Sequence, residues 1–254
     1  MKTLHMKKIA LTLAMGLATT LYVSAQGFNV GVNVGYGLGA GNSVIGINQT
    51  ATTSENVKGS YGQGLNFGLN LNYMFSENVG ADLGFGFLMG KEFTVTDNST
   101  SGSTGDMKLK GSMIRIMPGI KVSAGEDKSM SPYGRFGLVV GVGGKIKEKD
   151  TYTGAGFSGT YEYEYSGGSS FGWYGAFGIG FELSDKIKLN TELISINQTY
   201  GPEKAENTAR SDGQSLDPAI TLDDNDVASN PNTGLKQYTP FGSIGLNVGI
   251  QIGF

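Results

Sequence analysis

Charged side chains recur at equivalent positions of several alternating segments, and they are the residues of this chain best suited to do chemistry. Three are acidic and four are basic, so that their charges nearly cancel: Asp82, Glu182, Glu192, Arg115, Lys121, Arg135 and Lys188. Buried charges are tolerated when they pair with opposite charges. The set therefore predicts either a structural plug of salt bridges or a gate that selects solutes in a narrow pore.

Histidine and cysteine are almost absent from the sequence. The chain has no cysteine, and its one histidine, His5, lies close to the N-terminus. Ser-His-Asp hydrolysis and His-ligated zinc need an imidazole, and thiol or disulfide chemistry needs a cysteine. We therefore expect a protein that is not an enzyme and that has no cofactor. A catalytic site built only from Asp, Glu, Ser and Tyr is the remaining alternative.

An acidic run in the longest loop, about residues 198–234, invites comparison with calcium sites. Asp223, Asp224 and Asp226 lie close together in it. The spacing lacks the glycine and the distal glutamate of an EF-hand loop. We expect a solvated polar loop here and no metal.

The elements that must position the charged residues are strands, as the C-terminal segment GSIGLNVGIQIGF shows. From Ile244 to Phe254 every even position is bulky and apolar, and every odd position is Gly, Asn or Gln. A period of two is typical of a strand with one apolar face. Bulky residues facing lipid and small residues facing a narrow lumen give the glycines a steric purpose.

Eight segments share this alternation, at residues 28–38, 65–73, 79–89, 112–122, 132–144, 171–183, 187–193 and 244–254. Short connections alternate with long polar ones along the chain. This pattern predicts an all-β fold, an eight-stranded antiparallel transmembrane β-barrel with short periplasmic turns and long extracellular loops. Ten strands, with a strand hidden in the last loop, is the alternative.

Aromatic residues collect near both ends of these segments, as expected for rings at the two membrane interfaces. On the eight-stranded topology we expect Phe28, Tyr73, Phe75, Tyr133 and Phe254 at the periplasmic end. At the outer end we expect Tyr36, Phe87, Trp173, Tyr238 and Phe241.

The first 25 residues have the pattern of a secretory signal peptide. Lysines precede an apolar stretch from Ile9 to Val23, and small residues then predict cleavage between Ala25 and Gln26. We expect a signal peptide over 1–25 and a barrel over 26–254, with Met6 as an alternative start. The chain is mildly acidic, with a formal net charge of −3, which argues against nucleic-acid binding.

A charged hairpin is predicted between the fifth and sixth strands. If the fifth strand keeps its alternation, Lys145, Lys147 and Lys149 stay on the inward face, and Glu162 and Glu164 join them there. Cross-strand Lys/Glu pairs would then stabilise the hairpin. On the opposite face an exposed aromatic stripe would follow, formed by Tyr161, Tyr163 and Tyr165.

The terminal Phe254, with Ile250 and Ile252 before it, resembles the C-terminal assembly signal of bacterial outer-membrane barrels. The chain as a whole resembles the small eight-stranded outer-membrane barrels, the OmpA-type transmembrane domain and OmpW-like proteins. The resemblance implies an outer-membrane location, contact with outer-membrane lipid and lipopolysaccharide, and recognition by the barrel assembly machinery. OmpA-type proteins often add a C-terminal peptidoglycan-binding domain, and because this chain stops at Phe254, cell-wall anchoring is not implied.

We expect a non-enzymatic role in envelope integrity and surface interaction, with an unidentified extracellular ligand bound by the loops of a monomer. One alternative is a narrow channel for small or apolar solutes. Another is a soluble lipocalin-like carrier, in which the apolar face would line the interior of the barrel.

Overall fold

The computed structural model describes residues 27–40, 43–98, 103–124, 129–154, 156–212, 214–224 and 233–254. All the regular elements in these ranges are β-strands. Among these residues no helix is long and apolar enough to cross a membrane. The predicted signal peptide and its cleavage site at Ala25 and Gln26 lie outside the described residues.

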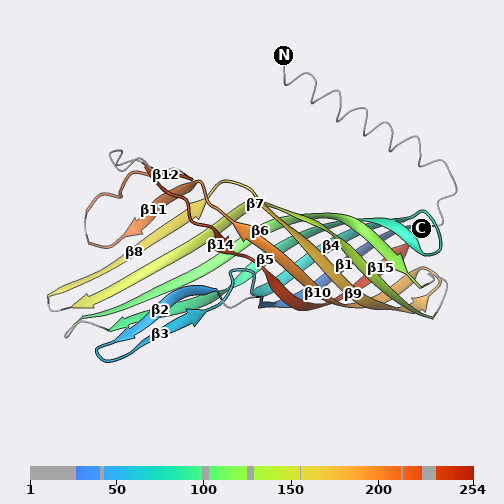
Figure 1. The fold of residues 1–254 in the computed structure, drawn as a ribbon, viewed down its shortest axis with the longest axis horizontal. Helices are drawn as coiled ribbons and strands as arrows, with labels where there is room; N and C mark the ends of the chain where they lie inside the picture. Colours follow the sequence, from blue (N-terminus) through green and yellow to red (C-terminus); the bar gives the residue numbers. More distant parts are fainter. Residues whose placement is uncertain are drawn as a thin grey trace, which may run out of the picture.

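Eight antiparallel strands close into a ring, which occupies the right-hand part of Figure 1. Each ring strand pairs with the next one. The last strand pairs with the first, with Val248 opposite Val34, and this pairing closes the ring. The ring strands are β1 (Gly27–Gly39), β4 (Gly64–Met74), β5 (Val79–Asn98), β6 (Thr104–Ser123), β7 (Met130–Gly154), β9 (Ser170–Ser184), β10 (Ile187–Tyr200) and β15 (Ser243–Gly253). The predicted eight-stranded barrel is confirmed.

The apolar positions of the alternating strands point away from the ring. Val32 on β1 is 59% exposed and Leu246 on β15 is 64% exposed, and the same holds for apolar residues on every other ring strand. A continuous apolar band of this kind is stable only against lipid. The soluble-carrier alternative is therefore wrong, because it requires these side chains inside.

Small residues on the inward positions leave room for larger side chains of other ring strands. A Cβ atom added at Gly119 of β6 would collide with the hydroxyl of Tyr174 on β9. One added at Gly68 of β4 would lie 2.5 Å from Oδ1 of Asn33 on β1. The inward glycines thus make space in a narrow lumen, as the alternation predicted.

Three neighbouring strands continue far beyond the ring. β5 and β6 have 20 residues each and β7 has 25, whereas β4 and β15 have 11. The extensions pair with one another, and β8 (Phe157–Ser166) and β11 (Lys204–Arg210) complete an extracellular sheet in the left half of Figure 1. The remaining short strands at this end are β2 (Val44–Thr50), β3 (Ser54–Lys58), β12 (Ile220–Asp223), β13 (Thr233–Leu235) and β14 (Thr239–Pro240).

A β-bulge at the junction reverses the alternation of β7. The register between β6 and β7 shifts after Val142, and Gly143 adopts a positive φ of 60° that favours glycine. Beyond the bulge Ile146 is buried and Lys147 is exposed. The expectation that Lys145, Lys147 and Lys149 face inward is therefore wrong, because one extra residue turns the strand over.

A matching irregularity lies on the neighbouring strand pair. The register between β5 and β6 shifts between Met89 and Glu92. Met89 is exposed on the lipid-facing side, and Phe93 beyond the shift is buried. The extracellular sheet therefore carries its apolar face inside, opposite to the barrel below it.

The aromatic residues follow the predicted sorting with two exceptions. Phe28, Phe75 and Phe254 are exposed and lie at the strand ends on the side of the C-terminus, whereas Tyr36, Phe87, Trp173 and Tyr238 are exposed and lie toward the opposite strand ends. Tyr133 is instead buried on the inward side of β7, and Phe241 is 0% exposed. Both residues lie at the predicted ends of the barrel but do not face the lipid interface, because Tyr133 occupies an inward position of its strand and the segment before β15 turns into the barrel.

Candidate functional site in the barrel lumen

Three of the predicted charges meet in one buried cluster inside the ring. Arg135 of β7 binds Glu192 of β10 through two contacts, Nε to Oε2 at 2.7 Å and Nη2 to Oε1 at 2.8 Å. Its Nη1 lies 2.7 Å from Oδ2 of Asp82 on β5. We call Asp82, Arg135 and Glu192 the ionic cluster. It connects three strands, β5, β7 and β10, no two of which are neighbours in the ring.

Neutral donors complete the coordination of the two carboxylates. Tyr174 donates a hydrogen bond of 2.9 Å to Oδ2 of Asp82, and Asn72 donates to its Oδ1. Asn247 donates to Oε1 of Glu192 at 3.3 Å. Buried charges are costly unless paired and hydrogen-bonded, and these partners supply both conditions.

Two more predicted charges are buried in the lumen on either side of this cluster. Lys121 lies over the ring of Tyr133 at 5.1 Å, a cation–π contact. Arg115 is held by neutral acceptors: Oε1 of Gln198 at 2.9 Å and the carbonyl of Phe241 at 2.8 Å, with Oδ1 of Asn66 at 3.1 Å.

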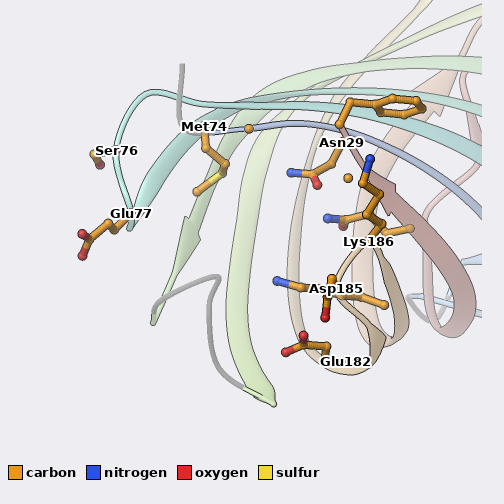
Figure 2. A pocket seen from close by; sticks show the side chains of 12 residues that line it. Asn29, Met74, Ser76, Glu77, Glu182, Asp185 and Lys186 are labelled. Atoms are coloured by element: carbon orange, nitrogen blue, oxygen red, sulfur yellow. The ribbon is translucent and has the colours of Figure 1, made fainter. Parts of the chain in front are cut away.

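Glu182 and Lys188 lie apart from the ionic cluster. Both line an open vestibule of about 600 Å³ at the end that carries the C-terminus. Figure 2 shows Glu182 there with Glu77, Asp185 and Lys186, pointing into open space at the strand ends. Both residues lie on the inward side of their strands, as predicted. Because they are close to the strand ends, they line the vestibule and not the packed lumen.

Above the charged residues the lumen is filled by apolar side chains. One buried group surrounds the upper side of the ionic cluster: Met117, Val139, Tyr174, Ile194 and Ile196. A second group fills the extracellular half: Tyr61, Leu88, Phe93, Val95, Leu109, Met113, Ile146, Tyr200 and Phe241. We call this second group the apolar plug.

Two chain segments turn inward to build the apolar plug. The segment before β4 carries Tyr61, and the segment before β15 carries Phe241, whose rings stack at a centroid distance of 5.7 Å. Main-chain bonds fix the pair: Tyr61 N donates to the carbonyl of Pro240 at 2.9 Å, and Phe241 N donates to that of Gln198 at 2.9 Å.

Sequence reasoning missed this plug. Tyr61 and Phe241 lie in connecting segments with no periodic pattern, so nothing in the sequence marks their direction. One signal was present within the strands: Leu88 and Met113 of the plug are apolar at inward positions, where the pattern predicts small or polar residues. Val139, Ile194 and Ile196 of the first buried group share this feature.

Small cavities lie between the filled layers. Two of them have a volume of about 30 Å³ each, one beside Lys121, Arg135 and Glu192, and the other beside Arg115 and Arg135. A cavity of this size holds one or two water molecules when polar groups line it. The space beside the lumen charges is thus limited to pockets much smaller than the vestibule.

The predicted surface hairpin is formed by β7 and β8, with its faces exchanged. Lys145 contacts Glu164 at 2.7 Å and Lys149 contacts Glu162 at 2.7 Å, on the outer face of the extracellular sheet. Lys147 lies 4.0 Å from Glu164. The predicted exposed stripe of Tyr161, Tyr163 and Tyr165 is half-buried and lies on the other face, with Glu148.

A second acidic pair lies on that inner face, beyond the membrane. Burial and the neighbouring Asp150 together raise the pKa of Glu148 to about 7, against the lowering effect of a hydrogen bond from Tyr165. Burial also raises the pKa of Asp150. Oδ1 of Asp150 is buried without a hydrogen-bond partner among the described residues. The Glu148 carboxyl is therefore partly protonated near neutral pH.

The predicted assembly-signal residues lie on the outer face of the last strand and just after it. Ile250 and Ile252 are exposed on β15, and Phe254 packs against Phe28 of β1 at a ring distance of 6.3 Å. Of the acidic loop residues, Asp224 accepts a hydrogen bond of 3.0 Å from Tyr238, and Asp226 lies outside the described residues.

The chain matches one family model over most of its length. Residues 9–217 match the outer membrane protein β-barrel domain. The search of curated proteins finds no match.

Several solved structures share the architecture. The outer membrane protein OprG from Pseudomonas aeruginosa is 13% identical, with a TM-score of 0.48, over 91% of this chain and 96% of that one. Neisserial surface protein A is 11% identical, with a TM-score of 0.43, over 91% and 99%. The attachment invasion locus protein Ail of Yersinia pestis is 12% identical, with a TM-score of 0.30, over 90% and 97%.

The family match agrees with the closed eight-stranded ring and with its apolar outer band. The predicted resemblance to small outer-membrane barrels is thereby confirmed. This chain belongs to the outer membrane protein β-barrel domain family, and it resides in the outer membrane.

Proposed function

We propose that this protein is a closed, non-enzymatic barrel that acts at the cell surface through its extracellular sheet and loops. The observation that carries the proposal is that side chains fill the lumen at two separate levels, the ionic cluster and the apolar plug. If the lumen is closed, the surface available for interaction is the extracellular part. This part consists of β8, β11 and the upper halves of β5, β6 and β7.

The two levels close the lumen by different means. In the ionic cluster, Arg135 is 5% exposed and its guanidinium bridges two carboxylates from different strands. In the apolar plug, the rings of Tyr61 and Phe241 stack on each other, and main-chain hydrogen bonds hold both residues. Because the levels share no residue, loss of one leaves the other in place.

The absence of an enzyme site is supported by how the acidic groups are engaged. Asp82 and Glu192 are both bound by Arg135, so neither is free to act as a general base. The mature chain expected from residue 26 onward has no histidine and no cysteine. Among the described residues, no group of three or more acidic side chains is placed to hold a metal ion.

Single-channel conductance tests the proposal. Residues 26–254 are refolded into planar lipid bilayers, and the fluorescence of Trp173, the only tryptophan, verifies insertion. We expect no steady conductance from the wild type, and none from Arg135→Ala, because the apolar plug remains. A variant that combines Arg135→Ala with Tyr61→Ala and Phe241→Ala removes both levels and is expected to conduct.

A steady conductance of the inserted wild type would refute the closed lumen. It would favour a narrow channel for small solutes, the second candidate, which the open vestibule of about 600 Å³ supports from one side. In that case Arg135→Ala should increase the conductance by itself, since it removes the large cationic side chain that bridges the lumen.

A further inference from the structure

Arg115 is a buried cation that no carboxylate neutralises. It is 1% exposed, and its three hydrogen bonds go to neutral acceptors on Asn66, Gln198 and Phe241. Among the described residues no carboxylate oxygen lies within 4.0 Å of its guanidinium, whereas Arg135 binds two carboxylates. An arginine keeps its proton even when it is buried, so this charge cannot neutralise itself. Such a charge is costly unless an opposite charge lies beside it.

The membrane-spanning part of the lumen has an excess of positive charge. Two carboxylates and three cations are buried there among the described residues, so that the net charge is +1: Asp82, Glu192, Arg115, Lys121 and Arg135. Buried charges are screened much less than charges at a surface in water. One monovalent anion would make this part of the lumen neutral.

One of the two small lumen cavities is lined by both arginines of this group. Its volume is about 30 Å³, and none of the described residues that line it is acidic. The other small cavity differs, because Glu192 lines it. The remaining polar residues around the first cavity carry amide or hydroxyl groups: Asn33, Asn66, Asn70, Asn247 and Ser243. We call the space beside Arg115 and Arg135 the arginine cavity.

Hydrogen-bond donors outnumber acceptors around the arginine cavity. Ser243 lines it and is 3% exposed, and its hydroxyl makes no hydrogen bond within the part of the chain that the structure describes. Gln198 accepts from Nε of Arg115, and its own Nε2 is buried with no partner among the same residues. Buried donors are normally satisfied. This local excess of donors favours an acceptor that carries negative charge.

We propose that the arginine cavity binds a small monovalent anion of the size of chloride, between Arg115 and Arg135. A space that holds one or two water molecules accommodates a chloride ion, and it is too small for sulfate, phosphate or an organic acid. The anion supplies the opposite charge that Arg115 lacks, through charge-assisted hydrogen bonds. It also brings the buried charges of the lumen to zero.

Polar spaces lead to the arginine cavity from the end that carries the C-terminus. Gln251 lines both the open vestibule and the lower small cavity, and Arg135 and Asn247 line both small cavities. The vestibule shown in Figure 2 is therefore the side from which the anion enters. On the other side the apolar plug begins, with the carbonyl of Phe241 bound to Arg115. The site is a dead end, so the inference goes beyond the closed lumen and is compatible with it.

The test fills the arginine cavity with one methyl group. A Cβ atom added at Gly86 of β5, which lines the cavity, would lie 3.6 Å from Cβ of Arg115 and 3.6 Å from Cε of Met117. These are ordinary contacts, so Gly86→Ala is compatible with the fold and takes space from the anion. Gly134→Ala is the matched control, because its Cβ would meet only the carbonyl oxygen of Ala176, at 3.7 Å, and Gly134 does not line the cavity.

A second pair of variants changes charge instead of volume. Arg115→Gln removes the cation that has no carboxylate partner. Lys186→Gln removes the same charge from the vestibule, away from the arginine cavity. Each protein, as residues 26–254, is refolded into phosphatidylcholine vesicles. Its urea midpoint is then measured in sodium chloride, sodium bromide or sodium gluconate at equal ionic strength.

We expect chloride and bromide to raise the urea midpoint of the wild type above its value in gluconate. The increase should saturate with anion concentration, because a ligand that binds only the folded state stabilises that state. Both control variants should show the same increase. Gly86→Ala and Arg115→Gln should keep less than half of it. In crystals of the wild type soaked in sodium bromide, an anomalous difference peak is expected beside Arg115.

An equal effect of chloride on the wild type and on Gly86→Ala would overturn the proposal. Equal midpoints of the wild type in chloride and in gluconate would overturn it as well, and so would anomalous bromide peaks at surface lysines with none beside Arg115. If Arg115→Gln does not fold, Gly86→Ala decides the question by itself. These measurements are made at equilibrium and do not bear on conductance, so the closed lumen is tested separately.

Discussion

The lower and upper halves of β7 have opposite faces, although they belong to one continuous strand. From Phe136 to Val142 the strand turns apolar side chains outward to lipid, and Arg135 points into the lumen. From Lys145 onward it turns lysines outward, and Ile146 points inward. The solvent on the outer face, lipid below and water above, decides which face is apolar.

The change of face takes place at a bulge and costs only one extra residue. Gly143 has a positive φ and lies between the last lipid-facing valine and the first lysine. One residue inserted into a period of two moves every later side chain to the other face. A barrel strand thereby continues beyond the membrane as part of an ordinary amphipathic sheet.

The interiors of the two halves also differ, because the lower one holds the ionic cluster and the upper one holds the apolar plug. The largest loss of stability is expected when a charge of the ionic cluster is removed. Arg135→Ala leaves Asp82 and Glu192 as buried carboxylates without a cation. We expect a loss of about 3–5 kcal/mol in the free energy of unfolding. Urea titration of the protein in lipid vesicles, followed by Trp173 fluorescence, measures it.

Glu182→Ala is the matched control for this variant, because Glu182 is an exposed charge in the vestibule. Its effect should stay within about 0.5 kcal/mol. A loss in Glu182→Ala as large as that in Arg135→Ala would show that the ionic cluster has no special role.

The upper interior should respond to loss of an aromatic ring. Phe241→Ala removes a fully buried side chain from the apolar plug and should cost about 3 kcal/mol or more. Tyr238→Ala alters an aromatic residue only three positions away, which is 64% exposed, and should cost little. Equal urea midpoints for the two variants would contradict the inward turn of this segment.

The bulge between the halves can be probed with one methyl group. Gly143→Ala places a side chain at a φ of 60° and should cost about 1–2 kcal/mol, because L-residues are strained there. Gly175→Ala is the control, since the added Cβ has no atom within 4 Å at either site and only Gly143 has the positive φ. If both variants match the wild type in urea, the left-handed turn is not needed.

The most local effect concerns pH and is confined to the upper half. Because burial raises the pKa of Glu148 to about 7 from 4.5, the folded protein holds a proton that the unfolded chain releases. The stability of the extracellular sheet should therefore fall as the pH rises from about 4.5 to 7, and then level off. Hydrogen exchange of β7 and β8 amides at pH 5 and pH 8 reports this change.

Glu148→Gln should remove most of that pH dependence and increase protection at pH 8. Glu162→Gln, on the outer face of the same sheet, should leave it unchanged. Identical pH profiles for wild type and Glu148→Gln would show that the buried carboxyl pair is not responsible.

The sequence was sufficient for the membrane half of the fold. There apolar side chains cover the outward positions of every strand, so that alternation gives the strand number and the inward direction of Asp82, Arg135 and Glu192, although not the apolar residues at inward positions such as Val139 and Ile194. It was insufficient above the membrane. The direction of Lys147 depends on the φ of Gly143, and the position of Phe241 depends on packing against Tyr61, which is distant in the chain.

Labelling of single cysteines tests the reversal of faces most directly, because the native chain contains no cysteine. Cysteines are placed at Leu138, Ile146 and Lys147, and the barrel in lipid vesicles is treated with a water-soluble maleimide. We predict rapid labelling at position 147, and protection at position 146 by the plug and at position 138 by lipid. Rapid labelling at 146 with protection at 147 would contradict the reversal.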